Sequence, residues 1–314
     1  SSEGEVRFAD ATERLAPGLS EVGLVTDADW MDADGDGWDD LVVSTEWGPV
    51  HLWRNDDGRL LDATDTAGLG GMKGWWNGLR AVDVDGDGDT DLVALNVGLN
   101  TKYGRPTAES PAILYYGDMD GSGTPHLVEA KSKKNDLLPV RGRSCSANAM
   151  PVIRQNFGTF RDFALADLPT IYTAERLDGA MQFEANGFES GVWINESTSG
   201  APAFEFQAFP SIVQLSPAYG AAVADFNGDG FTDVFLAQNH DHREPETGIW
   251  RGGVGQMLHG TESGEYVPAT ALETGILLRG DATSAEAVDV DGDGDPDLVA
   301  TQNNDRVRVF LNQR

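Results

Sequence analysis

Residues 32–40 read Asp32-Ala33-Asp34-Gly35-Asp36-Gly37-Trp38-Asp39-Asp40, and the apolar run Leu41-Val42-Val43 follows directly. The pattern recurs in segments that start at residues 83, 118, 225 and 289, and apolar residues follow each copy. A fixed motif repeated along a chain indicates one structural unit used several times. Asp and Gly favour tight turns, and the apolar runs favour strands. We therefore expect five Asp-rich loops, each joining two neighbouring strands.

A second repeated element predicts a closed ring. It is a strand that ends in Ala-Thr before a Gly-containing turn, and it occurs at residues 59–64, 266–270 and 6–12. Only one more strand, residues 307–311, follows the last loop. We expect the N-terminal strand to complete that last blade, because ring closure removes two sheet edges.

The repeats place the chain in the all-β class, as a β-propeller of seven blades or of six. Five units carry a loop, and a sixth, around residues 181–210, has none. Residues 146–178 break the strand pattern, with apolar side chains at helical spacing, and we expect a helical insertion there. The whole chain, 1–314, is expected to form a single propeller domain including this insertion.

The loops have the composition of calcium sites. Acidic side chains recur at positions 1, 3, 5 and 9, position 7 can add a backbone carbonyl, and glycines at positions 4 and 6 let the backbone curl. Calcium prefers six to eight hard oxygen ligands. The predicted ligands, loop by loop, are Asp32, Asp34, Asp36, Trp38 and Asp40; Asp83, Asp85, Asp87, Asp89 and Asp91; Asp118, Asp120, Ser122 and Thr124; Asp225, Asn227, Asp229, Phe231 and Asp233; and Asp289, Asp291, Asp293, Asp295 and Asp297.

Two other interpretations of the loops are an EF-hand and a turn without metal. An EF-hand needs Glu at position 12, where these loops have Val43, Ala94, Glu129, Leu236 and Ala300, so only the third loop would qualify. A metal-free Asp-Gly turn is the simpler alternative for any single copy. The third loop departs most from the pattern, because Ser122 and His126 replace two carboxylates. We therefore expect four or five bound calcium ions.

The charge of the chain limits its partners. The formal net charge is −30, and 20 of the 52 acidic residues lie in the five loops. Such a charge argues against binding nucleic acid or an anionic membrane surface. No apolar run is long enough to span a membrane, and Cys145 is the single cysteine, so no disulfide forms within the chain. The first residues do not read as a signal peptide, and we expect them to begin a mature chain from which one was removed.

These motifs resemble the FG-GAP/VCBS repeat family, which includes the calcium-binding blades of integrin α-chain propellers. The middle of the chain, with Leu138-Pro139-Val140-Arg141-Gly142-Arg143-Ser144-Cys145, 188–192 and 214–217, resembles bacterial VCBS proteins of the ASPIC/UnbV-associated type. The resemblance implies a propeller, most simply of seven blades, with bound calcium and an extracytoplasmic location, either periplasmic or secreted. It implies no specific activity.

Three groups of residues outside the loops were also considered. Arg141 and Arg143 beside Cys145 could lower the thiol pKa, although a structural cysteine is the simpler interpretation. A polar cluster of His240, Asp241, His242 and Glu244 could bind a transition metal or form a solvated loop. A set of tryptophans could either stack on sugars or fill the space between blades: Trp30, Trp38, Trp47, Trp53, Trp75 and Trp76.

The first functional hypothesis is a non-catalytic interaction module or structural subunit, whose partner is another exported or membrane-anchored protein. A carbohydrate-binding lectin and a calcium-dependent hydrolase or lyase are the alternatives. The sequence contains no Gly-x-Ser-x-Gly elbow, phosphate loop or nicotinamide fingerprint. We therefore favour the non-catalytic hypothesis.

Overall fold

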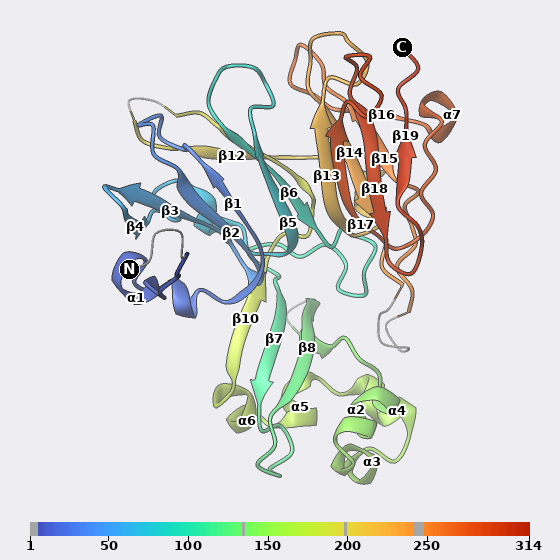
Figure 1. Ribbon diagram of the computed structural model, residues 1–314. Coiled ribbons are helices and arrows are strands. Elements are labelled where there is room, and N and C mark those ends of the chain that lie inside the picture. Colours follow the sequence, from blue (N-terminus) through green and yellow to red (C-terminus); the bar gives the residue numbers. More distant parts are fainter. Residues whose placement is uncertain (1–5, 134–135, 198–199, 242–247) are drawn as a thin grey trace.

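The computed structural model describes residues 6–133, 136–197, 200–241 and 248–314. Strands make up most of the ordered structure, and every helix is short. Four groups of antiparallel strands follow one another around an arc (Figure 1), and we call them blades 1 to 4 in chain order. Blades 1 and 2 are joined in one eight-stranded sheet, whereas blades 3 and 4 are separate sheets. The all-β class is confirmed, and the arrangement is β-propeller-like.

Blade 1 has four strands and carries the first Asp-rich loop between its first two. The apolar run after the loop forms a strand buried on both faces, as expected for the interior of a layered β fold. Its strands pair in chain order: β1 (Leu24–Met31), β2 (Asp40–Gly48), β3 (Val50–Asp56) and β4 (Arg59–Asp62).

Blade 2 is interrupted by a large insertion. Its strands are β5 (Gly74–Val82), β6 (Asp91–Asn96), β11 (Gly191–Asn195) and β12 (Phe204–Ala208). Strand β11 pairs with β6, placing Val192 opposite Val93. The prediction that residues 181–210 form a separate blade is therefore wrong, because β11 and β12 are the outer strands of blade 2. Two residue pairs between β2 and β5 join blades 1 and 2.

Blades 3 and 4 follow without interruption. Blade 3 consists of β13 (Ala218–Ala224), β14 (Asp233–Gln238), β15 (Gln256–His259) and β16 (Val267–Ala269). Blade 4 has only three strands, β17 (Ala282–Val288), β18 (Asp297–Gln302) and β19 (Arg308–Phe310). Each blade has its Asp-rich loop between its first two strands, and these four loops all lie on the same side of the blades, at the top of Figure 1.

The insertion forms a sheet with helices packed on it. Its strands are β7 (Ala112–Gly117), β8 (His126–Lys133), β9 (Asp136–Pro139) and β10 (Met181–Ala185), in the order β10-β7-β8-β9. Its helices are α2 (Arg143–Ala149), α3 (Val152–Asn156), α4 (Phe160–Leu165), α5 (Leu168–Tyr172) and α6 (Ala174–Asp178). The predicted helical insertion is confirmed. The third loop, between β7 and β8, belongs to this sheet and lies away from the other four (Figure 1).

Short helical turns precede β1 or follow the outer strands of blades 1, 2 and 3. They are α1 (Thr12–Leu15), η1 (Leu19–Glu21), η2 (Leu69–Gly71), η3 (Val213–Leu215) and α7 (Ala271–Thr274). Leu19 and Val22 pack against Leu41 and Trp53 on the outer face of blade 1.

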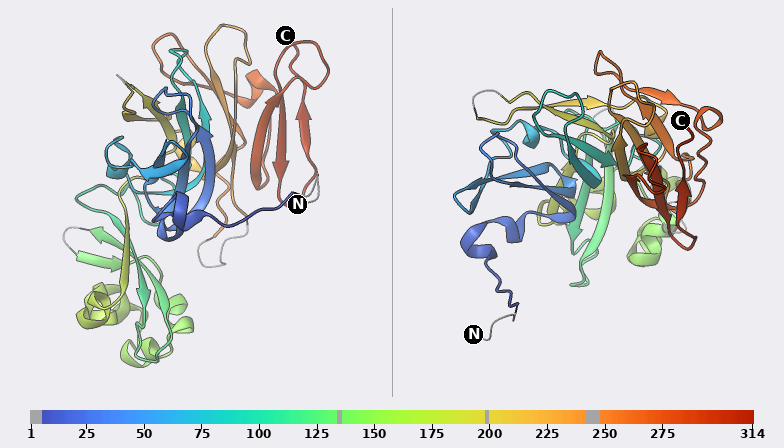
Figure 2. Two further views of the ribbon diagram at one scale, coloured as in Figure 1. Left: turned by 60° about the vertical axis from the view of Figure 1, so that its left-hand side comes forward. Right: turned by 45° about the horizontal axis from the view of Figure 1, so that its top comes forward.

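The predicted ring closure is not what the structure shows. Residues 6–11 belong to no strand, and blade 4 lacks the fourth strand that they were expected to supply. Helix α1 contacts β4 at the blade 1 end of the arc, whereas β19 lies at the opposite end (Figures 1 and 2). The described residues therefore form four blades in an open arc, and not six or seven in a closed ring.

Large apolar side chains fill the spaces between successive blades. Trp76, Leu92 and Trp193 are buried between blades 1 and 2, and Phe235 and Leu298 between blades 3 and 4. The inner strands β1, β5, β13 and β17 line a groove of about 300 Å³. The blade cores hold the strand ends in place, and this fixes where the loops start and end.

Candidate metal centre

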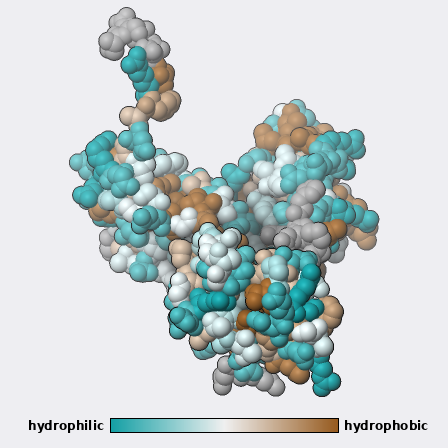
Figure 3. Space-filling model, turned by 90° about the horizontal axis from the view of Figure 1, so that it is seen from below, coloured by the Kyte–Doolittle hydropathy of each residue, from teal (hydrophilic) through white to brown (hydrophobic). Residues whose placement is uncertain are grey.

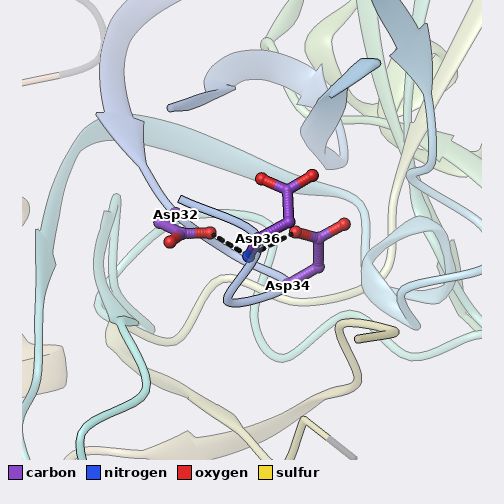
Figure 4. Close-up of side chains that lie close together, drawn as sticks. All are labelled: Asp32, Asp34 and Asp36. Atoms are coloured by element: carbon purple, nitrogen blue, oxygen red, sulfur yellow. Dashed lines mark hydrogen bonds between the residues drawn. The ribbon is translucent and has the colours of Figure 1, made fainter. Parts of the chain in front are cut away.

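One pattern of hydrogen bonds shapes all five Asp-rich loops. The side chain at position 1 accepts a bond from the backbone N–H of position 6, as from Gly37 to Asp32 at 2.9 Å. The side chain at position 3 accepts from the N–H of position 5, as from Asp36 to Asp34 at 3.2 Å (Figure 4). The equivalent bonds occur in the other four loops. The acidic side chains are thus turned toward the inside of each loop.

The glycines at positions 4 and 6 have the expected backbone conformation. Gly86 and Gly88 of the second loop have φ of 80° and 97°, in the left-handed region that other residues avoid. The corresponding glycines of all five loops also have positive φ. The tight curl of each loop therefore depends on glycine at both positions.

Three loops bring carboxylates close enough to share one cation. In each of them, one carboxylate oxygen per residue lies within 4.8 Å of the others. Oxygens bound to one calcium ion at ~2.3–2.6 Å are separated by at most about 5 Å, so this spacing fits a calcium ion. The three groups contain neither His nor Cys: Asp32, Asp34 and Asp36; Asp83, Asp85 and Asp91; and Asp289, Asp291 and Asp297.

The position 9 aspartate has a structural role that the sequence pattern did not reveal. Asp91 is 1% exposed, and its two oxygens accept the backbone N–H groups of Val84 at 2.9 Å and Asn195 at 2.7 Å. Asp40, Asp233 and Asp297 make the same pair of bonds in their blades. Each position 9 aspartate therefore ties its loop to the end of the third strand, and a second lone pair on each oxygen stays available to a metal.

Burial makes these buried carboxylates harder to ionise in the absence of a cation. Desolvation raises the pKa of Asp91 to about 6, opposed by its backbone hydrogen bonds. Desolvation likewise raises the pKa of Asp40 and of Asp233. Asp85 is exposed, yet partial desolvation is again the first cause of a raised pKa, and the neighbouring charges of Asp87 and Asp83 add to it. A bound cation would offset both the desolvation and the repulsion between neighbouring carboxylates.

An asparagine at the end of the third strand is a site residue that the sequence reasoning missed. The side-chain amide of Asn195 donates to the carbonyl of Thr90 in its own blade, at 3.2 Å, and to Ala33 in the loop of blade 1, at 3.0 Å. Asn312 repeats this arrangement with Pro296 and with Phe226 of blade 3. The recurring triplets Trp53-Arg54-Asn55, Trp193-Ile194-Asn195 and Phe310-Leu311-Asn312 were the available signal.

The fourth loop differs from the other blade loops in its side chains. Asn227 replaces an aspartate and donates to Asp229 at 3.0 Å. His259 occupies the strand position next to Gly260 and lies 3.2 Å from Asp233. Arg314 forms an ion pair with Asp295 of the fifth loop. This loop thus keeps oxygen ligands at positions 1, 3, 5 and 9, with one negative charge fewer at these positions than a loop that has aspartate at all four.

The third loop keeps the backbone curl but loses the position 9 carboxylate. Gly123 donates to Asp118 at 2.8 Å, as in the other loops. His126 stands at position 9, with its ring nitrogen 3.6 Å from Asp120. From α6, the guanidinium of Arg176 donates to the carbonyl of Met119 at 3.0 Å. With Ser122 at position 5 and His126 at position 9, this loop offers a metal fewer carboxylates than the blade loops do.

Most of the tryptophans fill the core. Trp47, Trp53, Trp75 and Trp76 are buried, so the interpretation of these residues as core is confirmed. Trp76 lies between blades 1 and 2, whereas Trp53 lies on the outer face of blade 1. Trp47 and Trp75 stack at 5.7 Å in an aromatic cluster with Tyr103. Trp30 and Trp38 differ, because about half of each side chain is exposed. The alternative interpretation, a sugar-stacking platform at Trp75 and Trp76, is therefore contradicted by their burial.

The two remaining candidate sites are the Cys145 thiol and the polar cluster around His240, and their side chains interact with neighbouring residues. Arg141 donates to the Cys145 sulfur at 3.5 Å and also pairs with Glu129, whereas Arg143 donates to the carbonyl of Phe157. In the polar cluster, His240 lies 3.8 Å from Asp281 and Asp241 pairs with Arg251. His242 and Glu244 lie outside the described residues.

A model of FG-GAP-like repeats matches residues 32–94 and 225–300. These two stretches are FG-GAP-like repeats. They contain the four blade loops, and the third loop lies outside them. No curated protein sequence matches the chain.

Solved structures resemble the chain only distantly. A rhamnogalacturonan lyase from Bacillus licheniformis is 14% identical with a TM-score of 0.36, over 89% of this chain and 41% of the lyase. The exotype rhamnogalacturonan lyase YesX gives the same identity and TM-score over 89% of this chain and 39% of its own. BBS1N, solved in complex with ARL6DN, is 10% identical with a TM-score of 0.23, over 93% and 80%. The chain thus spans about two fifths of the length of the two lyases.

The FG-GAP-like repeats are not accompanied by a membrane-spanning helix in the described part of the chain. None of the helices there has both the length and the apolar character needed to cross a bilayer.

Proposed function

We propose that the chain is a calcium-stabilised, non-catalytic interaction module that works outside the cytoplasm. The observation that carries the proposal is the convergence of three aspartate oxygens within 4.8 Å in three separate blade loops. Like charges held this close repel each other unless a cation lies among them. The fourth loop has the same backbone curl and oxygen donors at the same positions. We propose four calcium ions, one in each blade loop.

Calcium suits these loops better than other metals. Zinc and copper prefer nitrogen and sulfur ligands, and the three carboxylate groups offer neither. Magnesium demands a strict octahedron and keeps several waters, whereas calcium accepts a flexible set of carboxylate and carbonyl oxygens. We propose that the position 7 carbonyls of Trp38, Asp89, Phe231 and Asp295 complete the shells.

A location outside the cytoplasm follows from the affinity expected of such sites. Extracellular calcium modules bind calcium with dissociation constants of ~10⁻⁴–10⁻³ M. The calcium concentration outside the cytoplasm is high enough to fill such sites. FG-GAP-like repeats, present here at 32–94 and 225–300, are typical of extracellular proteins.

Protein binding is the role that these features support best. The helical insertion presents Phe160 and Leu165 of α4, with 65% and 77% of each residue exposed. We propose another exported or membrane-anchored protein as the partner of this insertion. Burial of Trp75 and Trp76 leaves the lectin alternative without its platform. No specific observation favours the hydrolase or lyase alternative.

Calcium binding by matched variants tests the proposal. Asp36→Asn removes an oxygen charge that belongs to the first carboxylate group, whereas Asp39→Asn changes an exposed residue of the same loop outside that group. Titration calorimetry on chelator-treated protein should give four ions for the native chain and Asp39→Asn, and three for Asp36→Asn. Equal binding by the two variants, or none by the native chain at millimolar calcium, would refute the proposal.

A further inference from the structure

Blade 4 has an open edge where the other blades have a fourth strand. Blades 1, 2 and 3 each have an outer strand, β4, β12 or β16, hydrogen-bonded to the third. In the described residues, no strand pairs with the outer edge of β19. Val307 and Val309 are more than half exposed there. An unpaired edge of this kind is a template for an added strand.

The N-terminal segment has the sequence of the missing strand. Residues 7–12, Arg-Phe-Ala-Asp-Ala-Thr, match 59–64 of blade 1, Arg-Leu-Leu-Asp-Ala-Thr, at four of six positions. The turn after them is also the same, because Thr12 donates its N–H to Asp10 and Thr64 to Asp62, both at 3.0 Å. Yet Phe8 is 96% exposed. The segment is thus built as an outer strand but has no sheet to join.

A cavity between blades 3 and 4 matches the side chain of Phe8. In blades 1 and 2, the residue opposite the third-strand asparagine is large and apolar: Leu60 faces Asn55, and Phe204 faces Asn195. Phe204 fills the space between blades 1 and 2. The same register would place Phe8 opposite Asn312, which lines a cavity of about 440 Å³ with Phe226 and Phe310. This cavity is the counterpart of the space that Phe204 fills.

The partner in this pairing is a second copy of the chain. The N-terminal turns are packed on the outer face of blade 1 through Leu19 and Val22, and β19 lies at the far end of the arc (Figure 1). The segment before them extends away from the body (Figures 2 and 3). We propose that residues 7–11 of one copy add to β19 of another, with Phe8 in the cavity between blades 3 and 4. This head-to-tail contact generates a ring or an open chain of copies.

Disulfide trapping between separately tagged chains tests the pairing. The register sets Ala9 opposite Leu311, and directly opposed residues are close enough for a disulfide. An Ala9→Cys chain is mixed with a Leu311→Cys chain, both carrying Cys145→Ser, and oxidised in air. We expect a disulfide between the two tags, and none when either chain is oxidised alone. Absence of this heterodimer at all concentrations up to ~0.5 mM protein overturns the proposal. So does an Ala9→Cys/Leu311→Cys double variant that crosslinks only within one chain.

Self-association of point variants provides a second measurement. Removing the Phe8 side chain from its cavity with Phe8→Asp should raise the dissociation constant of the assembly by roughly ten- to a hundredfold. Ile249→Asp, at an exposed apolar residue between β14 and β15, should leave the dissociation constant unchanged. Sedimentation measures both variants on the full chain. If Phe8→Asp associates like the native chain, or if Ile249→Asp weakens association equally, the proposal is wrong.

Discussion

The asparagine that links two blades gives a prediction that does not depend on any metal. Asn195→Ala removes two donated hydrogen bonds, to Ala33 and Thr90 at 3.0 and 3.2 Å, and one accepted from Ala203 at 3.3 Å. The residue is 1% exposed, so water cannot replace these bonds. At about 1 kcal/mol for each bond, with buried carbonyls left unpaired, the free energy of unfolding should fall by about 3–4 kcal/mol.

Asn55 is the matched control, because it occupies the same position in blade 1. Its amide donates to Asp39 at 3.0 Å and its oxygen accepts from Gly58 at 2.9 Å, both in exposed surroundings and within one blade. Asn55→Ala should cost about 0.5–1.5 kcal/mol, since water takes over the lost bonds. Urea denaturation in chelator measures both variants. Equal losses for the two variants would refute the idea that this asparagine connects neighbouring blades.

Three further predictions concern the loop backbone, a half-buried histidine and the core. Gly88→Ala, at φ of 97°, should lower the free energy of unfolding by about 1–2 kcal/mol. Gly158→Ala, in open space at an ordinary φ, should leave the free energy of unfolding within about 0.5 kcal/mol of the native value. Urea denaturation measures both variants. Burial lowers the pKa of His51, so its contribution to stability is complete above about pH 6.5 and falls by up to about 1.4 kcal/mol per pH unit below it. His51→Gln should remove this part of the pH dependence of the free energy of unfolding. An unchanged pH dependence below about pH 6.5 would contradict the prediction. Trp76→Ala, at a fully buried residue, should lower the free energy of unfolding by about 3–5 kcal/mol. Trp30→Ala, at a half-exposed residue, should lower it by less than about 1.5 kcal/mol. The same denaturation assay measures both.

The loops could be predicted from sequence because their geometry is local. Each Asp-x-Asp-Gly-Asp-Gly run fixes its own curl through hydrogen bonds that span at most five residues, such as Gly37 to Asp32. The helical insertion was also visible, since its apolar periodicity differs from that of the strands around it. These features depend on neighbouring residues alone.

Features that depend on distant pairing could not be predicted in the same way. The segment 181–210 looked like a separate blade because nothing local shows that β11 pairs with β6, about 100 residues earlier. The clamp between Asp91 and Asn195 spans 104 positions and was missed for the same reason. Ring closure was inferred from the strand-like sequence of residues 6–12, but strand propensity does not say which edge a strand joins.

A crystal structure of the chain grown in millimolar calcium is the most direct test of the metal sites. We predict a density peak in each of the four blade loops, with six to eight oxygens at ~2.3–2.6 Å, including the position 9 aspartate. Ordered water alone in these loops, with oxygens at hydrogen-bond distances of about 2.7–3.0 Å, would contradict the assignment of the chain as a calcium-stabilised module.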